Sequence, residues 1–301
     1  MSTLFEPLKK QSHSKRVGLK PNLSFWQDVW RRLKKNRMAL VGLSILTFMV
    51  IMAIVGPYLS RYAYYEIHLP SKNTPPCRTF WFGTDDLGRD MFTRIWWGAR
   101  ISLLVGVTAA LIDMIIGVIY GSCAAYFGGR VDEIMMRISD VLYAVPSLLI
   151  TILLIVVMGP GLATIIIAMT VAGWITMARI VRTQIHQIKQ MDYVLAAKTM
   201  GASPRRIIWR YLIPNTMGSI VTTVTLTIPA AIFTEAFLSF LGLGIQAPIA
   251  SWGTMASDGL SAMRYYPWRL FFPAGFISVS MLAFNMLGDG LRDALDPRLR
   301  K

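Results

Sequence analysis

The sequence contains few of the residues from which metal and redox sites are built. Among its 301 residues are two cysteines, Cys77 and Cys123, and three histidines. The histidines are scattered, and none has a cysteine or carboxylate at the spacing of a metal-ligand set. The topology predicted below puts one cysteine outside a membrane and the other deep in a span, so we expect no disulfide between them. We also expect no metal bound by this chain.

Patterns for nucleotide binding and hydrolysis are missing too. No G-x-x-x-x-G-K-[ST] pattern occurs, and no glycine is followed by lysine, so the chain cannot hold nucleotide phosphates as a P-loop does. No serine, histidine and aspartate lie together, and no apolar run carries two carboxylates. We therefore predict that the chain is not an enzyme and binds no cofactor. If ATP drives its activity, another subunit binds the ATP and magnesium.

Apolar residues are abundant: 54% of the sequence is hydrophobic and the mean hydropathy is +0.49. This exceeds the usual composition of soluble domains. A membrane-crossing helix needs roughly 17–25 mainly apolar residues. Six runs meet that length, at about 38–59, 101–123, 141–158, 162–178, 215–237 and 270–288. The sequence therefore predicts an all-α integral membrane protein with six transmembrane helices.

The positive charge of the chain is distributed in a way that predicts its orientation. The net charge of +15 does not gather on one soluble face or between stacking aromatic residues, so we expect no nucleic acid partner. With both termini in the cytoplasm, the internal segments hold 23 of the 31 lysines and arginines, and the external segments hold eight. The positive-inside rule therefore favours cytoplasmic termini. No apolar h-region precedes the first run, so we expect an uncleaved first span.

The first 37 residues predict a basic cytoplasmic tail. Ten lysines and arginines stand there against Glu6 and Asp28. One helical face of the tail is apolar and the other is basic, as in helices that lie on a membrane surface. The apolar face contains Phe25, Trp26, Val29, Trp30 and Leu33. We expect this helix to lie on lipid, with a transmembrane domain at 38–290 and a cytoplasmic tail at 291–301.

A polar stretch at 191–215, M-D-Y-V-L-A-A-K-T-M-G-A-S-P-R-R-I-I-W-R-Y-L-I-P-N, separates the fourth and fifth apolar runs. It predicts two short helices on either side of a hinge. Gly201 is free to take positive φ and ends the first helix. Ser203 suits the N-cap of the second, with proline at its first helical position. We expect this second helix to end before Pro214.

This stretch resembles the E-A-A-x(3)-G-x(9)-I-x-L-P loop of permease subunits in binding-protein-dependent ABC importers. Ala196, Ala197, Gly201 and Pro214 match at the same spacing, whereas Leu195 stands in place of the family's glutamate. The resemblance implies a type I ABC importer permease fold and a cytoplasmic loop at 186–213 that docks on a separate ATPase. The implied docking residues are Tyr193, Leu195, Ala196, Ala197, Met200, Gly201, Ala202, Ser203 and Arg206.

Two predicted external segments carry a narrower resemblance. The run F-G-T-D-D-L-G-R-D, within a loop predicted at 60–98, resembles the G-T-D-x-x-G-R-D segment of C-type oligopeptide and dipeptide permeases. The runs E-A-F-L-S-F-L-G-L-G and S-W-G-T-M-A-S-D-G border a second predicted loop, at 242–268, and resemble an external segment of the same permeases. The resemblance implies contact with an extracytoplasmic peptide-binding protein. The implied residues are Asp85, Arg89, Trp252 and Asp258.

Two features inside predicted spans are candidates for the translocation pathway. Asp113 is ionisable near the middle of a span, at an insertion cost of about 2.5–3.5 kcal/mol. It serves either as a proton relay or, as we favour, in a hydrogen bond between helices. Thr223 and Thr227 precede Pro229, which is expected to kink the helix. Their hydroxyls either line a polar pathway or bond to their own helix, and the sequence leaves both readings open.

Together these observations predict a permease subunit of an ATP-driven peptide importer in a bacterial cytoplasmic membrane. The resemblance implies a homologous permease subunit, two ATPases, an external peptide-binding protein and membrane lipid as partners. One alternative is a permease of the same family for another solute, such as a metal chelate. A proton-coupled secondary transporter and a membrane scaffold or enzyme are the remaining alternatives.

Overall fold

The computed structural model describes residues 25–295, whose regular structure is helical apart from one isolated β-bridge between Thr84 and Asp90. The α-helices are α1 (Phe25–Leu33), α2 (Arg37–Val55), α3 (Met91–Phe127), α4 (Gly129–Ala144), α5 (Ser147–Met158), α6 (Leu162–Ile188), α7 (Asp192–Thr199), α8 (Pro204–Ile207), α9 (Ile213–Phe240), α10 (Trp252–Ala262) and α11 (Trp268–Leu295). Short 3₁₀ turns occupy Gly56–Tyr58 and Leu69–Ser71, and a π-helical turn occupies Ile208–Leu212. The predictions for residues 1–24 and 296–301 lie outside the described range.

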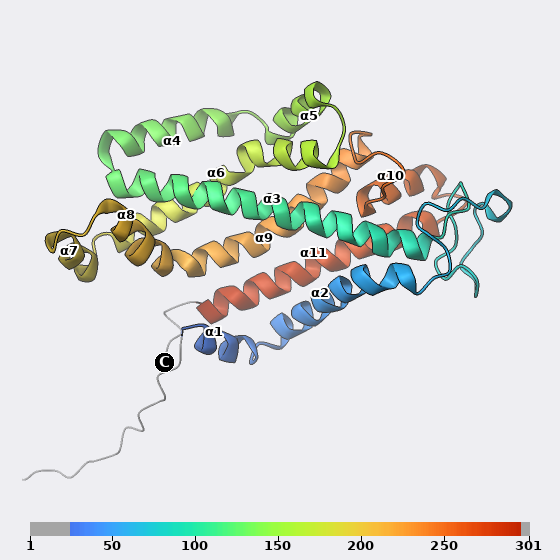
Figure 1. Ribbon diagram of the computed structural model, residues 1–301, viewed down its shortest axis with the longest axis horizontal. Coiled ribbons are helices and arrows are strands. Elements are labelled where there is room, and N and C mark those ends of the chain that lie inside the picture. The colour runs from blue at the N-terminus through green and yellow to red at the C-terminus, as the bar shows by residue number, and fades with distance from the viewer. Residues whose placement is uncertain (1–24, 296–301) are drawn as a thin grey trace, which may run out of the picture.

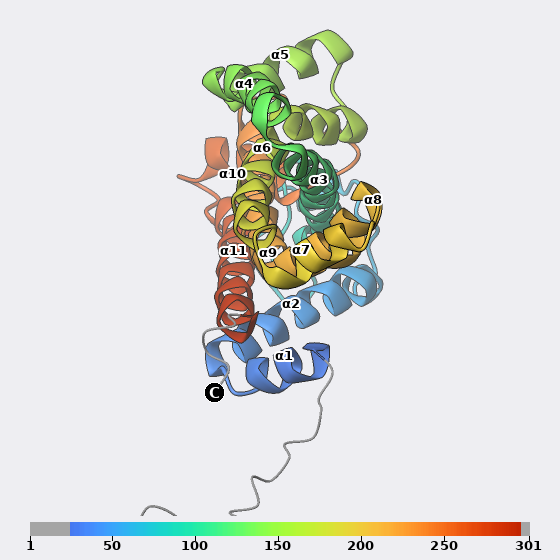
Figure 2. The same cartoon turned by 90° about the vertical axis from the view of Figure 1, so that its left-hand side faces the viewer.

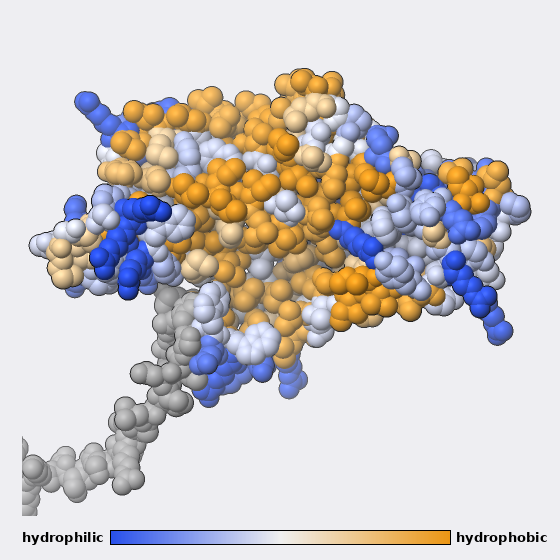
Figure 3. Space-filling view, viewed as in Figure 1, coloured by the Kyte–Doolittle hydropathy of each residue, from blue (hydrophilic) through white to orange (hydrophobic). Residues whose placement is uncertain are grey.

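The long helices α2, α3, α6, α9 and α11 run side by side along the longest axis of the molecule (Figure 1). Viewed from one end, these helices form a bundle (Figure 2). Hydrophobic side chains cover the middle of the visible face, and hydrophilic ones gather toward its ends (Figure 3). Within residues 25–295, five helical segments are long and apolar enough to cross a bilayer. The predicted all-α membrane protein is confirmed.

Helix α3 lies at the centre of the packing because small residues let its neighbours approach. A Cβ added at Gly121 would lie 2.3 Å from the Ala178 carbonyl oxygen of α6. A Cβ at Gly106 would lie 2.7 Å from Ile232 of α9. Such close backbone contact is typical of helices that associate within membranes, where dispersion contacts replace the hydrophobic effect.

The predicted third span is not one straight helix. Helices α4 and α5 meet at an angle of 77° around Pro146, so the pair forms either a broken span or a re-entrant loop. Val145 adopts an extended conformation, as residues before proline tend to do, and this ends α4. The prediction of a single helix over 141–158 is therefore wrong.

Polar contacts hold α4 against α6. The Arg182 guanidinium donates from Nε and Nη2 to the two carboxylate oxygens of Asp132, at 2.5 and 2.7 Å. His186 Nε2 lies 3.1 Å from the same carboxylate. One turn further along, Arg179 donates to Asp140 at 2.8 Å. Most large apolar side chains of α4 are exposed, and these pairs link the helix to α6.

Several helices extend beyond the predicted spans. Helix α3 begins at Met91, within the predicted loop 60–98, and α6 continues to Ile188. Helix α11 continues to Leu295, so the start of the predicted C-terminal tail is helical. The predicted loop 242–268 contains α10. Asp90 caps the start of α3 and Ser251 caps the start of α10, so local capping rather than hydropathy determines where these two helices begin.

Helix α1 has the predicted amphipathic pattern. Val29 and Leu33 are buried against Ala294 and Leu295 at the end of α11. Trp30 is half exposed, and the Lys34 ammonium lies 5.2 Å from the centre of its ring. Contact between this helix and lipid stays a prediction. Cys77 and Cys123 are free, and residues 25–295 contain no cluster of three potential metal-binding side chains.

Candidate functional site

Helices α7 and α8 form an elbow, defined here as residues 191–209, at one end of the long axis (Figure 1). Gly201 has φ of +79° and joins the two helices. The Ala202 amide donates to the Ala197 carbonyl at 3.0 Å, which closes the end of α7. The Ser203 hydroxyl accepts a hydrogen bond from the Arg206 amide at 3.4 Å, as an N-cap does. The predicted order of helix, glycine and capped helix is confirmed.

The elbow has one buried face and one exposed apolar face. Val194 and Ala197 are buried and pack toward the bundle. Leu195 is 49% exposed and Met200 is 79% exposed. Ala197 is buried and so does not lie on the exposed face, whereas Ala196 is exposed; contact of this segment with an ATPase stays a prediction. An exposed apolar face of this kind is suited to a protein partner.

The connection from the elbow to α9 differs from the prediction. Pro214 does not end the second short helix, because the helical backbone continues from α8 through the π-helical turn into α9. The Ile213 amide bonds to the Ile208 carbonyl, five residues back. The Asn215 side chain donates to the Tyr211 carbonyl at 2.5 Å. The π-helical turn and this side-chain bond let a proline sit within a continuous helix.

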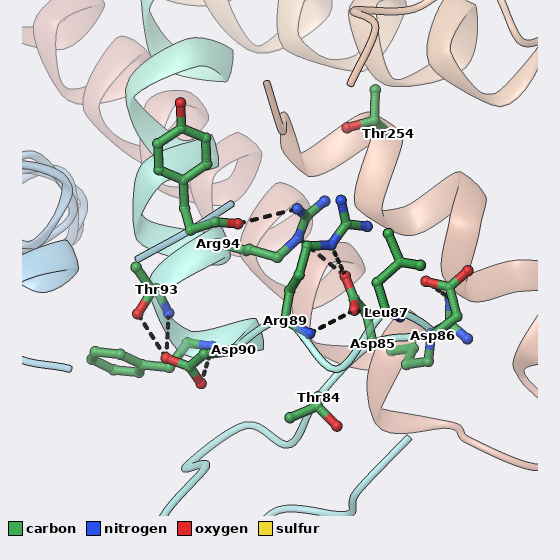
Figure 4. A network of polar contacts seen from close by, with 12 residues as sticks. Thr84, Asp85, Asp86, Leu87, Arg89, Asp90, Thr93, Arg94 and Thr254 are labelled. Atoms are coloured by element: carbon green, nitrogen blue, oxygen red, sulfur yellow. Dashed lines mark hydrogen bonds and ion pairs between the residues drawn. The ribbon is translucent and has the colours of Figure 1, made fainter. Parts of the chain in front are cut away.

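The opposite end of the bundle is built around the Asp85 carboxylate (Figure 4). It accepts hydrogen bonds from the backbone amides of Leu87 and Arg89 at 2.9 Å each. The Arg89 side chain donates to it at 2.6 Å, and Arg94 Nε lies 3.5 Å away. All three charged side chains are buried. A buried carboxylate needs such donors and cations, so Asp85 organises the loop from inside.

Asp90 begins α3 and thereby fixes the position of this loop. Its carboxylate accepts hydrogen bonds from the amides of Phe92 and Thr93, from the Thr93 hydroxyl and from the Ser60 hydroxyl. The first two bonds satisfy amides that a helix N-terminus otherwise leaves unpaired. The G-T-D-D-L-G-R-D run is therefore a structural unit that joins the loop to a membrane-spanning helix.

Trp252, for which the resemblance implies contact with the external binding protein, does not lie on the surface of this structure. Its side chain is fully buried, and Nε1 donates to the Ile95 carbonyl of α3 at 3.0 Å. Asp85 and Arg89 are also enclosed, so neither offers its side chain to an external partner. Asp258 is the exposed residue of the predicted set. Tertiary packing of α10 against α3 explains the difference.

Glu235 was not predicted as a functional residue, although it is fully buried. Its carboxylate accepts hydrogen bonds from the hydroxyls of Ser102 in α3, Ser239 in α9 and Ser251, the N-cap of α10, at 3.3, 2.9 and 2.6 Å. Three elements thus meet at one side chain. The sequence feature that could have identified Glu235 is that it is the single acidic residue within the apolar run that forms α9.

The predicted pathway residues lie in two places. Asp113 is buried in α3 against α6, and a Cβ added at Gly173 would lie 2.3 Å from its Oδ2. Its Oδ1 has no hydrogen-bond partner within the described chain, so the favoured hydrogen bond between helices is not formed there. Thr223 and Thr227 donate to carbonyls four residues back, which confirms the bonding to their own helix. Pro229 lies within a continuous α9.

Residues 113–301 match the family of binding-protein-dependent transport system inner membrane components. The chain belongs to this family. Residues 24–76 match the N-terminal TM domain of oligopeptide transport permease C. Members of the family are transport components of the inner membrane rather than enzymes, which confirms the predicted location and the prediction that the chain is not an enzyme.

Several curated relatives match this chain over most of their length. The oligopeptide transport system permease protein OppC of Bacillus subtilis is 58% identical, over 99% of this chain and 98% of the relative. The dipeptide transport system permease protein DppC of the same organism is 63% identical, over 94% and 88%. OppC of Escherichia coli is 43% identical, over 92% of both chains.

A solved structure supports the fold. A chain of the MetNI methionine ABC transporter, in an inward-facing form, matches with a TM-score of 0.57 and 18% identity. The match covers 68% of this chain and 98% of the other. The predicted ABC importer permease fold is therefore confirmed.

Proposed function

We propose that this chain is the permease subunit of an ATP-driven importer of oligopeptides or dipeptides. It forms half of the translocation pathway with a homologous permease subunit. Two ATPase subunits bind and hydrolyse ATP with magnesium, and an external binding protein delivers the peptide. The names of the close relatives support the solute class, and the near-complete match supports transfer of their role to this chain.

The two ends of the bundle support an orientation with the elbow in the cytoplasm. The elbow, α1 and the C-terminal end of α11 lie at the same end, whereas α10 and the loop before α3 lie at the other (Figure 1). The sequence puts most lysines and arginines on the side of the elbow. The positive-inside rule then places the elbow in the cytoplasm, where an ATPase can reach it.

The elbow carries this proposal, because it joins an exposed apolar face, through the turn at Gly201, to a helical segment that continues into a membrane-spanning helix. Leu195 and Met200 offer contact area, and the backbone continues from Pro204 into α9. A movement imposed by closing ATPases therefore moves α9 and changes access to the pathway. The ATPase must bind the elbow differently in the two access states for this coupling to act.

Replacement of Gly201 by valine tests the proposal. A β-branched residue at φ of +79° is strained by roughly 1–2 kcal/mol. We expect the variant to insert in the membrane but to lose peptide-stimulated ATP hydrolysis in the complete reconstituted importer. Gly159→Val is the matched control, since Gly159 has φ of +85°, and at both glycines an added Cβ has open space. Normal coupling in Gly201→Val would count against the proposed function.

A further inference from the structure

Arg100 of α3 closes the end of α2. Its Nε donates to the Ala53 carbonyl at 2.5 Å, and its Nη2 donates to the Ile54 carbonyl at 2.8 Å. The residue four positions after Ala53 is Pro57, which has no N–H to donate, so Arg100 supplies the missing donor. Within residues 25–295, Nη1 and the second hydrogen of Nη2 have no acceptor. Arg100 is only partly buried, so its guanidinium is accessible to a further partner.

Two aromatic rings flank this guanidinium. Its central carbon lies 4.6 Å from the centre of the Trp97 ring and 5.6 Å from that of Tyr58. Tyr64 stacks on Trp97, with ring centres 4.0 Å apart and ring planes at 10°. The Tyr58 side chain is 77% exposed. Tryptophan and tyrosine are enriched where a bilayer meets water, so this group of side chains is typical of the level of the lipid headgroups.

The length of α2 places the group at the same level. Helix α2 has 19 residues and is therefore about 28 Å long, close to the ~30 Å thickness of a hydrocarbon core. Its C-terminal end lies toward the end of the bundle that contains α10 (Figure 1). Ile51 and Leu104, about one turn further into the bilayer, are exposed apolar side chains. Arg100 thus binds the end of α2 where the hydrocarbon ends and the phosphate groups begin.

Arg100 has no anionic partner within residues 25–295, because it belongs to none of the ion pairs there. Arg179 provides a contrast. Its guanidinium lies 4.2 Å from the centre of the Tyr143 ring and also donates to the Asp140 carboxylate at 2.8 Å. Arg100 has the aromatic contact without the carboxylate. A guanidinium binds phosphate oxygens through parallel N–H groups, and Nη1 and Nη2 leave such a pair available.

We propose that Arg100, Trp97 and Tyr58 form a binding site for the phosphate group of a phospholipid, in the leaflet opposite the elbow. Nη1 and Nη2 donate to phosphate oxygens, and the exposed Tyr58 ring covers the adjoining part of the headgroup. The acyl chains lie along the exposed apolar side chains of α2 and α3. The bound lipid neutralises the charge that joins these two helices. This site goes beyond the proposed function and does not depend on which solute is transported.

Photocrosslinking in proteoliposomes of the complete permease pair tests the site. A small fraction of phosphatidylglycerol carries a photoactivatable group beside its phosphate, and the labelled peptides are mapped. We expect labelling at residues 54–64 and 97–104 to fall about tenfold in Arg100→Gln, the loss of a charge-assisted hydrogen bond. Arg78→Gln is the control, because it removes the same charge from an exposed position in the external loop and should leave the labelling unchanged.

A second variant separates lipid binding from folding. Tyr58→Leu removes an exposed ring and leaves the carbonyl bonds of Arg100 intact, and labelling should fall about threefold. Circular dichroism should show the same helicity in both variants. A probe with a neutral sugar headgroup in place of the phosphate should label the two segments weakly, whether or not Arg100 is present. Excess inorganic phosphate should not compete with phosphatidylglycerol.

Three results overturn the proposal. The first is equal labelling of Arg100→Gln and the unmodified protein. The second is equal labelling by the phosphate and sugar probes, or competition by inorganic phosphate, which would indicate contact without phosphate recognition or a site for a soluble anion. The third is loss of pairing with the homologous permease subunit in Arg100→Gln while lipid labelling persists, which would assign this surface to that subunit.

Discussion

The two ends of the bundle use similar local chemistry in different surroundings. Gly88 and Gly201 both have positive φ, at +75° and +79°. A Cβ at Gly88 would lie 1.9 Å from the His68 carbonyl oxygen, whereas a Cβ at Gly201 would have nothing within 4 Å. The charged residues Asp85, Arg89 and Arg94 are buried, whereas those of the elbow are exposed. At the end that contains α10, the charged residues are enclosed by other parts of this chain. At the elbow, they are exposed and available to a partner.

This difference separates stability from coupling. Residues at the end that contains α10 contact other elements of the chain, so their replacement should lower the free energy of unfolding. The exposed residues of the elbow, such as Leu195 and Met200, contact little of the chain, so their replacement should change the activity of the assembled importer.

The largest effect on stability is expected for Glu235→Ala. The change leaves a cavity between three elements and removes the acceptor of three serine hydroxyls, at a cost of roughly 3 kcal/mol. Glu235→Gln keeps the shape and should cost about 1 kcal/mol. Thermal unfolding of the purified protein in detergent measures both. Equal stability of the alanine variant and the unmodified protein would show that Glu235 does not hold α10.

Loss of an N-cap should cost different amounts at the two ends. Asp90→Ala removes the acceptor for two helix amides and two hydroxyls in a buried site, and we expect a loss of about 2 kcal/mol. Ser203→Ala removes one long hydrogen bond at an exposed site, and we expect about 0.5 kcal/mol. The same unfolding measurement compares the two variants. A larger loss for Ser203→Ala contradicts the comparison.

A small effect is also expected for Asp113→Asn. The Asp113 carboxylate forms no ion pair within the described chain, and asparagine keeps its shape, so unfolding should change by less than about 1 kcal/mol. Uptake in the reconstituted importer should also remain. ATP-depleted vesicles with a proton gradient give the control. Gradient-driven uptake that disappears in Asp113→Asn would support the alternative of a proton-coupled transporter.

Sequence reasoning succeeded where one or two neighbouring residues determine the backbone. Gly201 ends α7 and Ser203 caps α8 through local conformational preferences, and the lengths of the apolar runs identify the main spans. It failed for the bend at Pro146, because average hydropathy does not distinguish a straight helix from a broken one. Pro214 was read as a helix end, since the π-helical turn that accommodates it depends on surrounding residues.

Burial at the end that contains α10 depends on distant parts of the chain. Tryptophan is common at membrane interfaces, so the sequence does not indicate that Trp252 is buried. The packing of α10 on α3 encloses it. Glu235 gains its partners from Ser102, 133 positions away in the chain, and from Ser251, 16 positions away. The hydroxyls of Thr223 and Thr227 bond within their own helix, which the sequence could not separate from a role in the pathway.

Cysteine labelling in sealed right-side-out vesicles tests most directly that the two ends face opposite sides of the membrane. Exposed Cys77 is a natural label for the end opposite the elbow, and Met200→Cys places a label on the elbow, with Cys123→Ser as background. We predict that a membrane-impermeant maleimide reacts with Cys77 in intact vesicles and with the elbow cysteine only after the membrane is opened. Reaction of the elbow cysteine in intact vesicles would contradict the account.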